Sequence, residues 1–117
     1  MKRKILIVDS ELSIRMMLEN FLSDDYDVTA VQNGFEAISW LQHGNRADLL
    51  LVDTDMSMIN GYEFKQSIKK QKGMASVPVI MFSAESKNRM NTTLAQQPIN
   101  QEEIMTKINS AFRKATA

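Results

Sequence analysis

The sequence contains no cysteine and no long apolar run. Without a thiol, the chain cannot form disulfide bonds, hold zinc through thiolates or use a cysteine nucleophile. Its apolar runs are no longer than four residues, as in Ile5–Val8, whereas a helix that spans a membrane needs about 20. The basic start, Met1–Lys4, is followed only by that short run, which is too short for a secretory signal peptide. These absences favour a cytoplasmic domain whose own core stabilises it.

An excess of charge of one sign is also lacking, because 14 Lys and Arg balance 14 Asp and Glu over 117 residues. A neutral chain has no surplus charge for non-specific binding, so we expect no direct contact with nucleic acid and none with a membrane. A chain of this length matches the usual size of one domain, and we expect residues 1–117 to form a single domain. The only histidine, His43, follows a predicted helix and has no partner motif, so we interpret it as a solvated residue.

Short apolar runs alternate with segments of helical periodicity. Runs rich in Ile, Leu and Val predict buried strands, because a strand that is covered on both faces is apolar throughout. Apolar residues three or four positions apart predict the helices between them. This alternation is typical of an α/β protein with a doubly wound parallel sheet and right-handed crossovers. The predicted strands are 4–8, 27–31, 49–52 and 77–82, and the predicted helices are 11–23, 35–42, 62–71 and a last helix after Asn100.

Polar residues directly follow three of these strands: Asp9, Asp53 and Ser83. Ligands bind beyond the carboxyl ends of the strands in an open parallel sheet, so these side chains should meet at one edge. A single Asp at a strand end usually caps a helix or starts a turn. Two of them, with Asp55 close by, favour a Mg²⁺ site, because clustered carboxylates repel unless they share a cation or a proton. A carboxylate beside Mg²⁺ can also attack phosphorus and form an acyl phosphate.

Four segments, in order, resemble the receiver domain of two-component response regulators. The resemblance runs from about residue 4 to 84 and resumes at Pro98. It implies a flavodoxin-like fold with a doubly wound parallel sheet of five strands. It also implies a cytoplasmic signalling domain, not an enzyme, that takes a phosphoryl group from a histidine kinase or phosphotransfer protein and switches its surface towards a downstream target protein or effector domain. The four segments are Ile5–Glu11, Asp48–Asp53, Met56–Glu63 and Pro78–Ala84.

The resemblance assigns roles to four residues and implies Mg²⁺ as the cofactor. Asp53 falls on the family's phospho-accepting aspartate, and Asp9 falls on the first residue of the acidic pair that holds the metal. Asp55 falls two residues after the acceptor, where the family places a backbone carbonyl on the metal. Ser83 falls on the hydroxyl residue that bonds the phosphoryl group and helps to switch the surface.

Ser10 departs from the family pattern, which has a second acid and usual direct metal ligand at this position. A hydroxyl carries no charge and is a weaker Mg²⁺ ligand than a carboxylate, although the side chain of Asp55 could partly compensate. Two interpretations of Ser10 are open. It contributes to the metal site, or it only caps the helix that begins near Glu11, and we slightly prefer the cap.

The segment between Ser83 and Pro98 is roughly eight residues shorter than in the family, which is enough to remove a strand of typical length. Gln97 stands where the family has a lysine, and the family's switch aromatic is missing. Either the protein is a degenerate receiver with a shortened fifth-strand region, or residues between Ala84 and Pro98 are missing from this sequence. We favour the second explanation, because losing an edge strand together with its lysine is a heavy structural cost.

Two other functions are open. Ser10, Gln97 and the missing aromatic fit a degenerate pseudo-receiver, which is a protein-interaction module that works without phosphorylation. Asp53-Thr54-Asp55 is also the DxD pattern of haloacid-dehalogenase-type phosphatases, in which the first Asp attacks phosphorus and the second acts as acid and base. That family carries the motif on its first strand, whereas here it follows the third, so the phosphatase is the weakest of these hypotheses.

Overall fold

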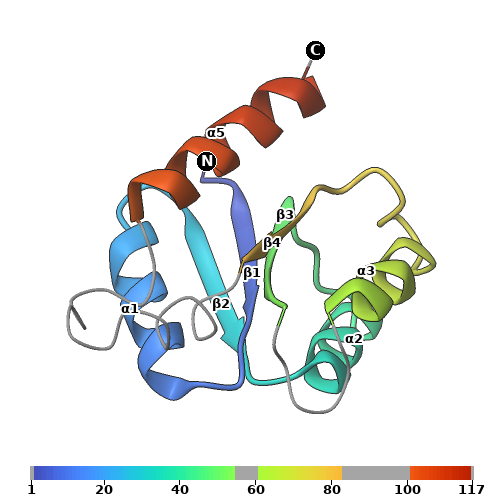
Figure 1. Cartoon of the computed structure of the whole chain (residues 1–117). Helices are drawn as coiled ribbons and strands as arrows, with labels where there is room; N and C mark the ends of the chain where they lie inside the picture. Colours follow the sequence, from blue (N-terminus) through green and yellow to red (C-terminus); the bar gives the residue numbers. More distant parts are fainter. Residues whose placement is uncertain (1, 55–60, 83–100, 117) are drawn as a thin grey trace.

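A parallel four-stranded sheet with helices on both faces makes up the described part of the computed structural model, which comprises residues 2–54, 61–82 and 101–116. The strand order is β2-β1-β3-β4, and each neighbouring pair is parallel. This is the doubly wound, flavodoxin-like arrangement, and Figure 1 shows α1 and α5 on one face of the sheet and α2 and α3 on the other. The elements are β1 (Lys4–Val8), α1 (Leu12–Leu22), β2 (Asp27–Val31), α2 (Gly34–Gln42), β3 (Leu49–Asp53), α3 (Gly61–Lys69), β4 (Val79–Phe82) and α5 (Gln101–Thr116).

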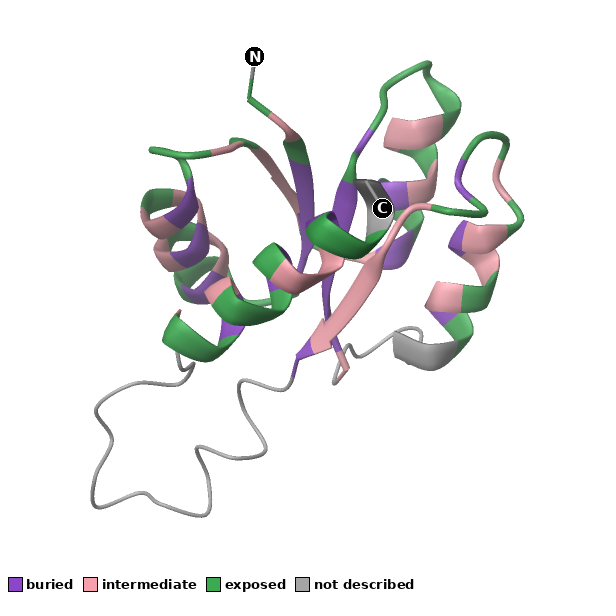
Figure 2. Cartoon of the chain, turned by 90° about the horizontal axis from the view of Figure 1, so that it is seen from above, coloured by how far each residue is buried: buried purple, intermediate pink, exposed green. Residues whose placement is uncertain are grey.

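The two central strands, β1 and β3, are buried on both faces. Every residue of β3 is buried, and so is every residue of β1 except Lys4. Figure 2 shows these two strands as the buried centre, with the partly buried β2 and β4 on either side. The unbroken apolar runs of β1 and β3 follow from this position, because helices cover both faces and leave no side for polar residues.

Alternation along the central strands divides the core into two clusters. Side chains at successive strand positions point to opposite faces of the sheet. Ile5 and Ile7 pack with residues of α1 and α5, whereas Leu6 and Val8 pack with residues of α2 and α3. The helices contribute residues that repeat with helical spacing, so the same strands hold both layers in place. These helix residues are Ile14, Leu18, Leu22, Ile104, Ile108 and Phe112 in the first cluster, and Ala37, Phe64 and Ile68 in the second.

The ends of α2 show why this helix begins and ends where it does. Asn33 is the N-cap, and its Oδ1 accepts a hydrogen bond from the Glu36 backbone N–H at 2.8 Å. The Glu36 carboxylate reaches back to the Gln32 backbone N–H at 3.1 Å, so both partners satisfy donors at the helix start. At the other end, Gly44 has a φ of +91°, a left-handed conformation that favours glycine and ends the helix.

The predicted and observed elements agree closely, except at the start of β4. The strand begins at Val79, two residues later than expected. The preceding residue, Pro78, has no N–H, and the polar groups of Val77 serve the loop instead. The Val77 N–H donates to the Met74 carbonyl at 3.2 Å, and the ammonium of Lys69 donates to the Val77 carbonyl at 2.6 Å. Burial, and then the charge of Lys65, lower the pKa of Lys69 from its usual value.

The predicted fifth strand and the proposed gap before Pro98 lie outside the described residues. The last helix is present as expected, although Asn100, after which it was expected to begin, also lies outside them. None of the helices in residues 2–54, 61–82 and 101–116 is long and apolar enough to cross a membrane.

Truncating the fully buried Leu51 in the central strand should destabilise the fold strongly. We expect Leu51→Ala to lower the free energy of unfolding by about 2–5 kcal/mol, because the change removes buried methyl groups and leaves a cavity. Urea denaturation followed by circular dichroism measures this. The matched control is Leu12→Ala, a truncation at a side chain that is 61% exposed, which should change the value by less than about 1 kcal/mol. Equal losses in the two variants would contradict this description of the core.

Candidate functional site

Asp9 and Asp53 meet at the carboxyl edge of the sheet. Asp53 is the last residue of β3, and Asp9 directly follows β1. The two strands pair in parallel with Val8 opposite Val52, so the two aspartates come next at the same level. Neighbouring strands lie about 4.8 Å apart, which brings these residues close together. The predicted meeting of these strand ends is therefore confirmed for this pair.

Both carboxylates are buried: Asp9 is 0% exposed and Asp53 is 1% exposed. They are the only buried polar or charged residues in the part of the chain that the structure describes. Burial of a carboxylate costs free energy unless other groups or a cation stabilise its charge. Two such residues side by side therefore mark a place where the fold gives up stability, as functional sites often do.

Hydrogen bonds hold Asp9 and the residue that follows Asp53 in position. Oδ1 of Asp9 accepts from the Glu11 backbone N–H at 2.8 Å, and the guanidinium of Arg15 donates to the Asp9 carbonyl at 2.7 Å. The Asp9 N–H donates to the Val31 carbonyl of β2 at 3.1 Å. Beyond Asp53, the Thr54 N–H donates to the Phe82 carbonyl at the end of β4, at 2.8 Å. Arg15 was not among the predicted site residues, since its spacing from Asp9 matches no familiar motif.

Ser10 is exposed beside Asp9, and its predicted role as an N-cap is wrong. The first helical residue is Leu12, and the N-cap position belongs to Glu11, which makes no side-chain capping bond. The carboxylate of Asp9 already binds the Glu11 N–H, which forms a turn between Asp9 and Glu11 and moves the helix start one residue further on. The position of Ser10 next to the buried pair leaves the metal-site interpretation in place.

The other predicted site residues, Asp55 and Ser83, lie outside the described residues, as does Gln97. The structure therefore brings together two residues of the predicted site, Asp9 and Asp53.

Leu12 and Met16, on the first two turns of α1, add a feature that helical spacing alone did not reveal. They are 61% and 59% exposed, which is unusual for large apolar side chains four residues apart on one helix.

The described residues suit a small, hard cation at this edge. Mg²⁺ is typically held by one or two carboxylates, with water and phosphate oxygens completing its coordination. Asp9 and Asp53 supply this number of carboxylates. Within residues 2–54, 61–82 and 101–116, no three His, Cys, Asp and Glu side chains gather as a metal-binding group, so a richer site such as a structural zinc centre is not formed there.

A comparison with known families shows to which family the chain belongs. The model of the response regulator receiver domain matches residues 5–109, which is most of the chain. The chain belongs to the response regulator receiver family. It is a receiver domain of the kind that response regulators use in two-component systems, and its fold is the flavodoxin-like receiver fold. Receiver domains are signalling domains, and members of this family bind Mg²⁺.

Solved structures support the same assignment. The chemotaxis response regulator CheY4 of Vibrio cholerae superposes with a TM-score of 0.77 at 25% identity, covering 95% of this chain and 99% of that one. The response regulator TrrA of Thermotoga maritima, solved in complex with Mg²⁺ and BeF, superposes with a TM-score of 0.74 at 28% identity, covering 93% and 98%. Both relatives share the fold over nearly their whole length.

Curated relatives are longer proteins. A probable transcriptional regulator, ycf27, of Porphyridium aerugineum is 32% identical over 122 residues, covering 97% of this chain and 49% of its own length. The transcriptional regulatory protein ResD of Bacillus subtilis is 31% identical with the same coverage. The chain spans 34% to 49% of the first three curated relatives.

The alignment with ycf27 of Porphyridium also contains a gap in this chain. It extends over 122 positions, whereas 97% of this 117-residue chain is about 113 residues. The relative therefore has about nine positions that have no counterpart here. This agrees in size with the shortening expected before Pro98.

Neutralising one buried carboxylate should stabilise the metal-free protein. Asp53→Asn keeps the shape of the side chain but removes a charge beside Asp9, so we expect the free energy of unfolding in EDTA to rise by about 1 kcal/mol or more. Urea denaturation measures the change. Asp24→Asn, the same exchange at an exposed position, should have almost no effect. A loss of stability in Asp53→Asn would show that repulsion between the two carboxylates is not significant.

Proposed function

We propose that this receiver domain accepts a phosphoryl group on Asp53 from a histidine kinase or phosphotransfer protein. The transfer depends on Mg²⁺ and switches a surface that binds a downstream target protein or effector domain. The observation that carries the proposal is the buried, in-register pair of Asp9 and Asp53 at the carboxyl edge of a receiver fold.

The chemistry follows from the position of Asp53. A carboxylate oxygen forms a bond to phosphorus while the bond from phosphorus to the donor's imidazole nitrogen breaks, and that nitrogen keeps the electron pair. The product is an aspartyl phosphate. Asp53 is held at the rigid end of a fully buried strand, so the nucleophile loses little freedom in the transfer. Its burial also limits access of bulk water, which favours transfer over hydrolysis.

Asp9 and Asp53 are the described residues that would hold Mg²⁺, with Ser10 and Asp55 as further candidates. The ion, when bound, would offset the charge of the carboxylates and of the incoming phosphoryl oxygens. The hydrogen bond from the Glu11 N–H keeps the Asp9 carboxylate oriented before any ligand arrives. We propose Ser83 as the hydroxyl that bonds the phosphoryl group.

The exposed side chains of Leu12 and Met16 suit the docking of a protein donor. They lie on α1, which begins three residues after Asp9, so a helix that packs on them would approach the site. An apolar contact of this kind would contribute binding free energy that a small phosphate donor cannot provide, because such a donor has no apolar surface to pack on these side chains.

The first test is formation of an acid-labile phosphate on Asp53. With Mg²⁺ and acetyl phosphate, we expect mass spectrometry to find one added phosphoryl group, which is absent in Asp53→Ala and present in the control Asp24→Asn. Beryllofluoride with Mg²⁺ should shift the backbone amide signals around Asp53. An unchanged spectrum, together with no added mass, would rule out phospho-acceptance. Repeated turnover of a phosphate ester would support the phosphatase hypothesis instead.

A second candidate function is a pseudo-receiver that binds its partner without phosphorylation. Ser10 favours it, because an exposed hydroxyl at this position leaves the described site with two carboxylates where the family pattern has three. Phosphate on Asp53 would exclude this candidate.

Replacing Ser10 by the acid of the family pattern tests how much the serine weakens Mg²⁺ binding. We expect Ser10→Asp to tighten Mg²⁺ binding roughly tenfold or more, since a third carboxylate raises both the charge and the number of strong ligands. Isothermal titration calorimetry measures the affinity. Ser13→Asp adds the same charge at an exposed position one helical turn further on and should change the affinity less than about threefold. Equal effects in the two variants would show that Ser10 does not face the metal.

A further inference from the structure

Arg15 of α1 binds the backbone of Asp9 at the point where β1 loses its neighbour. β1 and β2 pair in parallel up to Val8 and Val31, and the Asp9 N–H then donates to the Val31 carbonyl at 3.1 Å. In a continued parallel ladder, the Asp9 carbonyl would accept from an N–H two residues further along the neighbouring strand. β2 ends at Val31, and the guanidinium of Arg15 donates to this carbonyl at 2.7 Å. A side chain thus takes the place of the next residue of a strand.

Three different groups of Asp9 are held by hydrogen bonds. Its N–H is bonded to β2, its carbonyl accepts from Arg15, and its Oδ1 accepts from the Glu11 N–H at 2.8 Å. The bond from Arg15 involves a charged donor, and such bonds are stronger than those between neutral groups. It is also partly buried, so water competes with it less than at the surface. Together the bonds fix both the backbone and the carboxylate of Asp9.

The positive charge of Arg15 acts against binding of a metal ion. The guanidinium is held at the backbone of Asp9, and a Mg²⁺ ion bound by Asp9 and Asp53 would lie close to it, so the two cations would repel. An arginine that acted only through its charge would therefore weaken the Mg²⁺ affinity. Mg²⁺ also demands nearly ideal octahedral directions from its ligands, so a residue that fixes a ligand can more than offset such a repulsion.

We propose that Arg15 is a positioning residue of the metal site. Its hydrogen bond keeps the turn from Asp9 to Glu11 in the conformation in which the Asp9 carboxylate binds Mg²⁺. Without this bond the end of β1 gains freedom, and ordering it again costs free energy when the ion binds. The requirement is strict in this chain, because Ser10 supplies no second acid beside Asp9. The inference rests on the Mg²⁺ site of the proposed function.

The test compares two substitutions of Arg15 with one at an exposed arginine. Arg15→Met keeps an apolar side chain but removes the donors and the charge, and we expect the Mg²⁺ affinity in isothermal titration calorimetry to fall roughly fivefold to tenfold. Arg15→Lys keeps a charged donor and should remain within about threefold of the wild type. Arg46→Met removes the same charge at an exposed residue before β3, at the opposite end from Asp53, and should change the affinity less than about twofold.

The direction of the change separates positioning from the other roles that Arg15 could have. If only its charge mattered, Arg15→Met would bind Mg²⁺ more tightly than the wild type. If only its packing mattered, the free energy of unfolding would fall while the affinity of the folded protein stayed the same. Either result would overturn the proposal, and so would an equal loss of affinity in Arg15→Met and Arg15→Lys.

A measurement without metal tests the same bond independently. In EDTA, the Glu11 amide should exchange with solvent faster in Arg15→Met than in the wild type, because its bond to the Asp9 carboxylate is loosened, whereas Arg46→Met should leave the exchange rate unchanged. Unchanged protection of the Glu11 amide in Arg15→Met would overturn the proposal. If the wild type itself bound no Mg²⁺, the proposed function would fail, and the Glu11 amide would still show whether Arg15 holds this turn.

Discussion

The pairing of β1 with β3 is the constraint on which the rest of the structure depends. These two strands are buried on both faces, and their register places Asp9 and Asp53 at one level. A shift by one residue would turn every side chain of a strand to the other face and mix the two core clusters. The apolar side chains that fix the register therefore also fix the geometry of the two carboxylates. The stability of the core and the precision of the site have the same origin.

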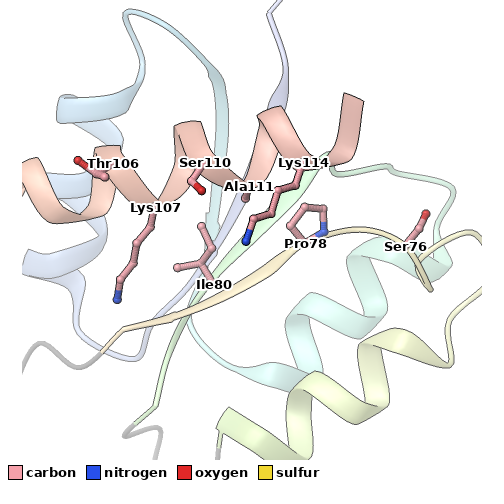
Figure 3. A pocket seen from close by; sticks show the side chains of 8 residues that line it. All are labelled: Ser76, Pro78, Ile80, Thr106, Lys107, Ser110, Ala111 and Lys114. Atoms are coloured by element: carbon pink, nitrogen blue, oxygen red, sulfur yellow. The ribbon is translucent and has the colours of Figure 1, made fainter. Parts of the chain in front are cut away.

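A hydrogen bond links the site to β4. The Thr54 N–H, which immediately follows Asp53, donates to the carbonyl of Phe82 at the end of β4. A change in charge at Asp53 acts next to this bond, at the end of a strand whose Ile80 lines a pocket together with residues of α5 (Figure 3). A receiver needs such a route if an event at one carboxylate is to alter a surface elsewhere. Two arrangements of the end of β4, with different populations before and after phosphorylation, would provide it.

Much of the fold could be predicted because its strongest signals are local. The runs 4–8 and 27–31 end at the observed residues, and the meeting of Asp9 with Asp53 followed from parallel topology alone. Ser10 was misjudged because sequence shows two capping side chains in a row but not which one reaches the Glu11 N–H. Similarly, β4 was expected to start two residues earlier because sequence does not show that Pro78 interrupts the run or that Val77 bonds instead to Met74 and Lys69. The exposure of Leu12 depends on which side of α1 faces the sheet. Periodicity alone does not show whether an apolar residue in the first turn faces the sheet or the solvent.

The strand order also has a consequence for the newly made chain. β1 is synthesised before the other strands of the sheet but is central, and its second neighbour, β3, begins at Leu49. At about 5–20 residues per second, the ribosome needs on the order of seconds to extend the chain from β1 to β3. During that time, one edge of a strand composed almost entirely of Ile, Leu and Val has no partner from its own sheet. A nascent chain with this topology is therefore most vulnerable to aggregation early, and chaperones that shield short apolar segments would have their largest effect before residue 49 emerges.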